Sequence, residues 1–206
     1  MAKIQTAKIS ADILQITSTI KTPKWPPASD RVRLTQNFVH QIFSPSNAVV
    51  YRTEELPNNL GISGTLYIRE KNLLSQFISK CVLCDLKCVF FTNDYWINEK
   101  ISYDDFTALT SSGRLEKLGL GNTIATLNNG EIVPYESLLE HTPALRCLCL
   151  KCNQYLQLSQ KFMEKICASN LEKFTVFQLP VNFETKAFLA NMAKKKPQLR
   201  VRLFFK

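Results

Sequence analysis

The sequence predicts an α/β solenoid, a partial horseshoe with a parallel sheet on its concave face and helices on its convex face. Two observations lead to this fold class. Five short segments align in one register, and a turn-forming stretch with a helical pattern of apolar residues follows each of the first four. Their starts lie 26 to 30 residues apart, the length of a unit that pairs one strand with one helix. The segments are LKCVFF from Leu86, LEKLGL from Leu115, LRCLCL from Leu145, LEKFTV from Leu171 and LRVRLF from Leu199.

The apolar positions 1, 4 and 6 of each segment are expected to point toward the helix of the same unit. Neither element can bury that face alone, so stacked units would build one continuous core. Arg202 occupies the fourth position of the last segment, which predicts a terminal, open edge there. The second position alternates in sign from unit to unit, so that in-register parallel strands would place opposite charges side by side. These residues are Lys87, Glu116, Arg146, Glu172 and Arg200.

Four regions are expected along the chain. Residues 1–20 form an N-terminal segment in which Ile9–Ile20 has the pattern of a short amphipathic helix. Residues 21–33 hold three prolines and read as a linker. Residues 34–61 form a cap of helix and strand, and residues 62–206 form an array of about five or six units.

The elements inside these regions follow from local patterns. In the cap, helical spacing of apolar residues predicts a helix over Leu34–Phe43, followed by a strand over Ala48–Tyr51. Gly64–Ile68 is expected to be the first strand of the array, with Leu66 and Ile68 in the fourth and sixth positions. The helices of the array are expected at Lys71–Cys81, Tyr103–Ser111, Pro134–Glu140, Gln160–Ala168 and Phe183–Lys194.

The composition is that of an ordinary globular protein. Of 206 residues, 45% are hydrophobic and 21% are charged, with a net charge of +9. Seven cysteines, an odd number, favour reduced thiols. The first residues lack an apolar run of signal-peptide length, and no stretch approaches the roughly 18 apolar residues of a spanning helix. We therefore expect a cytoplasmic or nuclear protein that does not contact a membrane.

The segment LRCLCLKCN, from Leu145 to Asn153, matches the pattern LxxLxLxxN in full. Over residues 62–206 the chain resembles leucine-rich-repeat proteins with ribonuclease-inhibitor-like repeats. Repeats of this irregular length are similar to those attached to F-box proteins, including divergent families expanded in nematodes. The resemblance implies the substrate-recognition part of a ubiquitin ligase adaptor, with the Skp adaptor and a cullin as further partners. Ser10–Ile20 departs from an F-box, because it lacks both the LPxE opening and the length.

The concave face is the expected binding surface for a protein partner. Side chains at positions 2, 3 and 5 would line it and mix charges, small residues and the aromatic rings of Phe90 and Phe177. The alternative is a charge row that only satisfies itself. The candidate partner-binding residues are Lys87, Phe90, Glu116, Lys117, Arg146, Cys147, Cys149, Glu172, Lys173 and Thr175.

We expect no catalytic residue, no cofactor and no metal site. Cys81 and Cys84 form CxxC, but a second cluster begins only at Cys147, too far along the chain for a compact zinc module. Lys117 and Lys173 would flank the Cys147 thiol from neighbouring strands and could lower its pKa. A nucleophile also needs a base, and the two histidines, His40 and His141, lie outside the strand rows. The sequence therefore indicates a non-enzymatic protein.

Two alternatives remain at this stage. The basic ends, Lys3–Arg33 and Lys194–Lys206, are compatible with a protein that associates with nucleic acid. Within the second, the run Lys194–Lys196 is equally explained by lysines that complement the dipole of a helix and keep it solvated. The chain is also compatible with a truncated family member that retains only the repeats.

Overall fold

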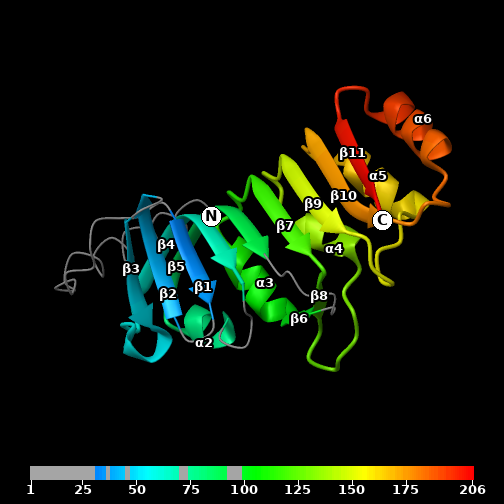
Figure 1. The fold of residues 1–206 in the computed structure, drawn as a ribbon. Helices are drawn as coiled ribbons and strands as arrows, with labels where there is room; N and C mark the ends of the chain where they lie inside the picture. Colours follow the sequence, from blue (N-terminus) through cyan, green and yellow to red (C-terminus); the bar gives the residue numbers. More distant parts are fainter. Residues whose placement is uncertain (1–30, 36–37, 45–46, 70–73, 92–98) are drawn as a thin grey trace, which may run out of the picture.

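The computed structural model describes residues 31–35, 38–44, 47–69, 74–91 and 99–206. In these ranges the protein is a mixed α/β structure with one nine-stranded, mostly parallel sheet and one two-stranded sheet. Figure 1 shows the helices α3, α4 and α5 along one face of the large sheet. The opposite face carries no helix among the described residues, and we call it the open face.

The large sheet has the order β11-β10-β9-β7-β5-β4-β1-β2-β3. From β4 to β11 the neighbours follow one another along the chain, apart from the small strands of the second sheet. In this spatial order, every neighbouring pair between β11 and β1 is parallel. The last two pairs, β1-β2 and β2-β3, are antiparallel. The strands are β1 Arg31–Thr35, β2 Phe38–Ser44, β3 Asn47–Arg52, β4 Leu60–Ile68, β5 Cys81–Phe91, β7 Lys117–Gly121, β9 Cys147–Lys151, β10 Lys173–Leu179 and β11 Arg200–Phe205.

The predicted register of four segments is confirmed. Val89 of β5, Leu118 of β7, Leu148 of β9 and Phe174 of β10 pair across the sheet as fourth positions, and all four are buried. The extra unit upstream is confirmed as well, because Leu66 and Ile68 of β4 pair with Val89 and Phe91. The core therefore lies between the sheet and the helices, where the ring of Phe162 in α5 packs 5.8 Å from that of Phe174.

The predicted register of the last segment is wrong by one residue. Val201, and not Arg202, pairs with Phe174, and Leu203 pairs with Val176. Val201 and Leu203 pack against the core, whereas Arg202 is exposed and pairs with Thr175. Leu199 is still buried, as the first residue of each segment is. Only one residue separates Leu199 from Val201, whereas two residues separate the corresponding buried residues of the other segments.

The cap differs from the prediction. Where a linker end and a helix over Leu34–Phe43 were expected, the described residues form β1 and β2, and only the strand over Ala48–Tyr51 is confirmed, within β3. β1 supplies the backbone partners that the free side of β4 needs, and β2 and β3 continue the sheet from it. Strand pairing of this kind overrides helical spacing in a short segment. Residues 1–20 and most of the expected linker lie outside the described residues.

The expected helices of the array are confirmed at α2 Leu74–Ser79, α3 Tyr103–Thr110, α4 Tyr135–Leu138, α5 Gln160–Ala168 and α6 Thr185–Lys195. Short 3-10 turns lie at Thr53–Glu55 and Leu139–His141. Two helices begin at a serine cap, since Ser102 accepts from the amide of Asp105 at 3.0 Å and Ser159 from that of Phe162 at 3.2 Å. The small parallel sheet of β6 Glu99–Ser102 and β8 Thr123–Thr126 was not predicted.

The asparagine that ends the LxxLxLxxN segment closes its turn as expected. The Asn153 side-chain oxygen accepts hydrogen bonds from the amides of Tyr155 and Leu156, both at 2.9 Å. Its amide nitrogen donates to the Tyr135 hydroxyl at 2.9 Å, and that hydroxyl donates to the Thr123 carbonyl at 3.0 Å. Burial raises the pKa of Tyr135, so the phenol stays protonated in this network. The turn after β9 is thereby tied to α4 and β8.

Candidate partner-binding groove

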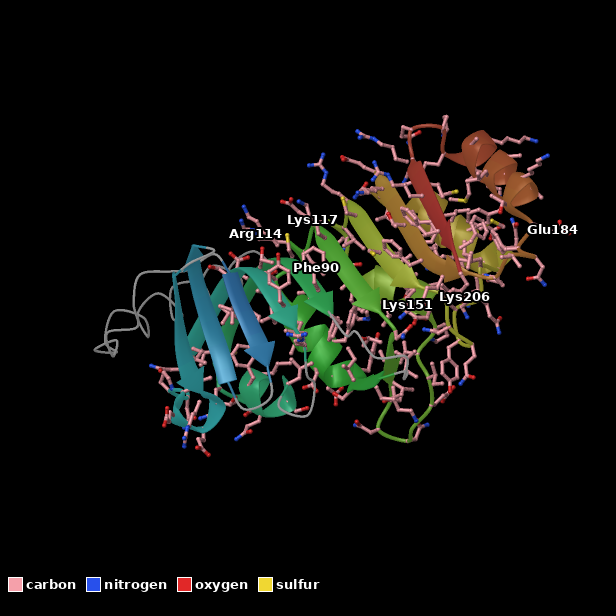
Figure 2. The ribbon with its side chains drawn as sticks, viewed as in Figure 1. Phe90, Arg114, Lys117, Lys151, Glu184 and Lys206 are labelled. Carbon is pink, nitrogen blue, oxygen red and sulfur yellow. The ribbon has the colours of Figure 1, made fainter. Side chains whose placement is uncertain are left out.

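The open face contains a groove of about 370 Å³ that crosses strands β5 to β11. Figure 2 labels Phe90 and Lys117 on the same side of the sheet. Of the described residues that line the groove, three are cationic and none is acidic. The lining is Phe90, Lys117, Leu118, Cys147, Leu148, Cys149, Lys173, Thr175, Phe177, Arg202 and Phe204.

Two rows of side chains on neighbouring strands build this surface. The third positions of the first four segments pair in the expected order, Cys88, Lys117, Cys147 and Lys173. The expected fifth member, Val201, is wrong, because Arg200 of β11 pairs with Lys173. Lys117 and Lys173 therefore flank Cys147, one from each neighbouring strand. The fifth-position row consists of Phe90, Gly119, Cys149, Thr175 and Arg202.

Aromatic rings stand at both ends of the groove. At the β5 end, Phe90 stacks on Tyr67 of β4 with ring centroids 5.4 Å apart. At the β11 end, Phe177 and Phe204 stack with centroids 4.7 Å apart, and they are 39% and 46% exposed. Phe177 and Phe204 therefore leave apolar surface open to solvent at the β11 end, whereas Phe90 and Tyr67 are half-buried.

Gly119 determines where the Phe90 ring lies. A Cβ atom at Gly119 would come within 2.8 Å of Phe90 Cδ1, closer than real carbon atoms approach. The absence of a side chain on β7 thus lets the ring of the neighbouring strand lie across the backbone. Any other residue at this position would force the ring to move.

The charge row is adjacent to the groove but does not line it. Glu116, Arg146 and Glu172 stand immediately before β7, β9 and β10, and Lys87 lies within β5. Backbone hydrogen bonds join the four residues in the predicted order. Arg146 Nε donates to Glu172 Oε1 at 2.8 Å, and both side chains are more than half exposed. The Glu172 carboxylate raises the pKa of the Arg146 guanidinium. The structure therefore supports a self-satisfying charge pair for Arg146 and Glu172. Arg200 leaves this row, because it pairs with Lys173.

Cys147 and Cys149 are two free cysteines that line the groove. Cys147 and Cys149 are half-buried on the same face of β9, and burial raises the pKa of Cys149, with Lys173 acting in the opposite direction. His141 contacts Tyr103, with 2.5 Å between its Nε2 and the Tyr103 hydroxyl, and it does not line the groove. Among the described residues no three His, Cys, Asp or Glu side chains are grouped as metal ligands would be.

The CxxC cysteines lie elsewhere, at the start of β5. The Cys81 thiol donates to the Phe77 carbonyl at 3.4 Å, and Cys84 is buried. Their mutual hydrogen bond holds the pKa of Cys81 above its usual range and lowers that of Cys84. The two thiols therefore interact with each other and do not contribute to the groove lining.

The structure brings six predicted residues together in the groove: Phe90, Lys117, Cys147, Cys149, Lys173 and Thr175. Arg202 and Phe204 were missed, because the last segment was aligned one residue out of register. The alternation of Val201 and Leu203 with Arg200 and Arg202 is the sequence signal that identifies the correct facing.

Comparison with known proteins gives no assignment: no protein-family model and no curated protein matches the chain. In the part of the chain that the structure describes, no helix has the length and apolar character required to cross a membrane. Function is therefore argued from the groove itself.

Proposed function

We propose that the chain is a leucine-rich-repeat module in which each unit contributes one strand to a curved sheet and one helix to the opposite side. Three observations support this class. Strands β4 to β11 are parallel and neighbour one another in chain order, the fourth positions form one buried row, and Asn153 closes the turn after β9. The strands β1, β2 and β3 then extend the array as a cap.

In this proposal the module is a non-enzymatic protein that holds a protein partner on its open face. The observation that carries it is the groove, which combines three cationic side chains with two stacked ring pairs, of which the pair of Phe177 and Phe204 is exposed. Aromatic side chains and arginine are enriched at partner-binding surfaces, and the rings and Arg202 match that composition. The adaptor role in a ubiquitin ligase stays a prediction, since residues 10–20 lie outside the described residues.

Quantitative affinity purification from cells of the source organism tests the proposal. The bait pair is the tagged wild-type chain and K117E/K173E, which reverses both groove lysines. The matched control is K186E/K194E, which makes the same charge change on exposed lysines of α6. We expect a set of proteins that binds wild type and the α6 control but is lost with the groove variant, and that persists after nuclease treatment.

A partner set that is the same for the wild type and the groove variant would contradict the assignment of the groove. Skp and cullin peptides among the proteins that stay bound at high salt would support the ligase prediction. That outcome does not depend on how the groove variant behaves. Nucleic-acid-binding proteins that disappear on nuclease treatment would support the rival function.

A further inference from the structure

We infer that the groove binds a short acidic peptide segment that carries an aromatic side chain between two carboxylates. The inference rests on the proposed function and specifies the chemistry of the partner. It places the carboxylates on Lys117 and Lys173 and the aromatic side chain between the Phe90 and Phe177 ends of the groove.

Charge complementarity is the first argument. Lys117 and Lys173 lie two strands apart, about 10 Å at the usual spacing, with Cys147 between them. In an extended peptide the side chains at positions i, i+2 and i+4 point to one side, so carboxylates at i and i+4, about 13 Å apart, can face the groove together with a ring at i+2. Flexible lysine stems span the difference. Arg202 adds a third positive charge at the β11 end, where no acidic residue lines the described groove.

The apolar surface is the second argument. Small side chains, Cys149 and Thr175, form the middle of the groove, and the aromatic rings stand at its ends. From β5 to β10 there are three strand spacings, about 14 Å. That length accommodates about four residues of extended chain. A ring on the peptide would bury the exposed edges of Phe177 and Phe204, and aromatic pairs contribute beyond their buried area.

Aromatic rings and lysines also suit a single-stranded nucleic acid, but the surroundings of the groove favour a peptide. The carboxylates of Glu116 and Glu172 stand immediately before the strands that carry Lys117 and Lys173. They would repel a continuous phosphate chain, whereas a peptide brings only two local charges. Arg146 neutralises only part of that acidic border, since its bond is to Glu172.

Fluorescence anisotropy with the full chain tests the inference. The probe is fluorescein-labelled Glu-Gly-Phe-Gly-Glu amide, called the Glu-Phe-Glu peptide below, and the comparison probes replace both Glu by Gln, both Glu by Lys, or Phe by Ala. Labelled oligo-dT is the nucleic-acid probe. We expect binding of the Glu-Phe-Glu peptide that weakens about fivefold or more with each of the three changes. Binding should also weaken between about 0.05 M and about 0.3 M NaCl, because exposed charges are screened.

Protein variants identify the site. K117Q/K173Q should weaken binding of the Glu-Phe-Glu peptide by about tenfold, and F177A/F204A by a similar factor. The control K186Q/K194Q on α6 makes the same charge change and should stay within about twofold of wild type. Circular dichroism of each variant excludes unfolding as the cause of a loss.

The outcomes separate the two proposals. Stronger binding of the Lys peptide overturns the acidic-peptide inference, but it leaves the proposed function in place because the groove still binds peptide. No binding of the Glu-Phe-Glu peptide up to about 1 mM also overturns the inference. Tighter binding of oligo-dT that K117Q/K173Q abolishes overturns both.

Discussion

At the scale of single residues, the backbone of β7 at Gly119 determines where the Phe90 ring of the neighbouring strand β5 lies in the candidate groove. The ring lies where a side chain of β7 would otherwise stand, and it stacks on Tyr67 on its other side. Gly119 therefore shapes the groove without lining it. This role is invisible in the sequence, because a glycine in a strand is equally compatible with a bulge.

Gly119→Ala should move the Phe90 ring off its present rotamer, because the new Cβ would lie 2.8 Å from Cδ1. An off-rotamer ring costs about 1 kcal/mol in the free energy of unfolding, which urea denaturation measures. Gly61→Ala is the matched control, since nothing lies within 4 Å of its Cβ position. Equal stability of Gly119→Ala and wild type would show that the ring adjusts without cost.

At the scale of elements, Lys196 connects the end of α6 to the end of α5. Its ammonium donates to the carbonyls of Ile166, at 3.4 Å, and Ser169, and the residue is buried. Of the lysine run, Lys194 and Lys195 lie in the exposed last turn of α6, as the sequence predicted. Lys196 corrects that prediction, because it fills unsatisfied carbonyls at the end of a neighbouring helix.

Burial lowers the pKa of Lys196 below its usual 10.5. The folded state therefore binds fewer protons than the unfolded state in the window just below pH 10.5, and Lys196 contributes increasing stability as pH rises through that window. The variant Lys196→Met lacks this pH-dependent contribution to stability. The free energy of unfolding of wild type minus that of the variant should rise from neutral pH toward pH 10.5 and then level off.

Urea denaturation of both proteins across this range measures the difference. The other ionisable groups are present in both proteins, so most of their effect on the difference cancels. A difference that is flat or that falls with pH would contradict the stated environment of Lys196. Lys194→Met removes one charge from an exposed lysine of the same run and is the control for the loss of charge itself.

At the scale of the whole molecule, one sheet carries both the core and the candidate site. Fourth-position residues point to the helices, whereas third- and fifth-position residues point to the groove. Residues that build the core therefore alternate along each strand with residues that build the groove. Leu148 stands at the middle of the buried row, between Leu118 and Phe174. The stability of the sheet should therefore depend on it more than on any residue at an edge.

Leu148→Ala should lower the free energy of unfolding by about 3 kcal/mol, through lost apolar burial and a residual cavity. Leu189→Ala on α6, where the side chain is 38% exposed, should cost far less. Because the core is continuous, hydrogen exchange should show reduced protection in both β5 and β10. Loss confined to β9 and the strands after it would instead mean that the two ends of the sheet unfold separately.

The sequence was sufficient for the α/β class, four registers and five helices, because buried positions recur at a fixed spacing in long units. It failed where local and tertiary preferences compete. Leu34–Phe43 has helical spacing, but its backbone pairs with strands that periodicity cannot locate. It also failed at Arg202, because alignment on Leu199 conceals a missing residue. The groove needed the structure, since stacking of Phe177 on Phe204 depends on that register.

The shortened segment before β11 has a consequence for how such a surface can diversify. With one residue fewer after Leu199, Val201 and Leu203 remain on the core side while Arg200 and Arg202 turn to the open face. A change of one residue in length moves every side chain of a strand to the other face of the sheet. The last segment keeps its core because its basic and apolar residues alternate to match the shorter spacing. Length and alternation must therefore change together if the open face is to gain new side chains while the core stays apolar.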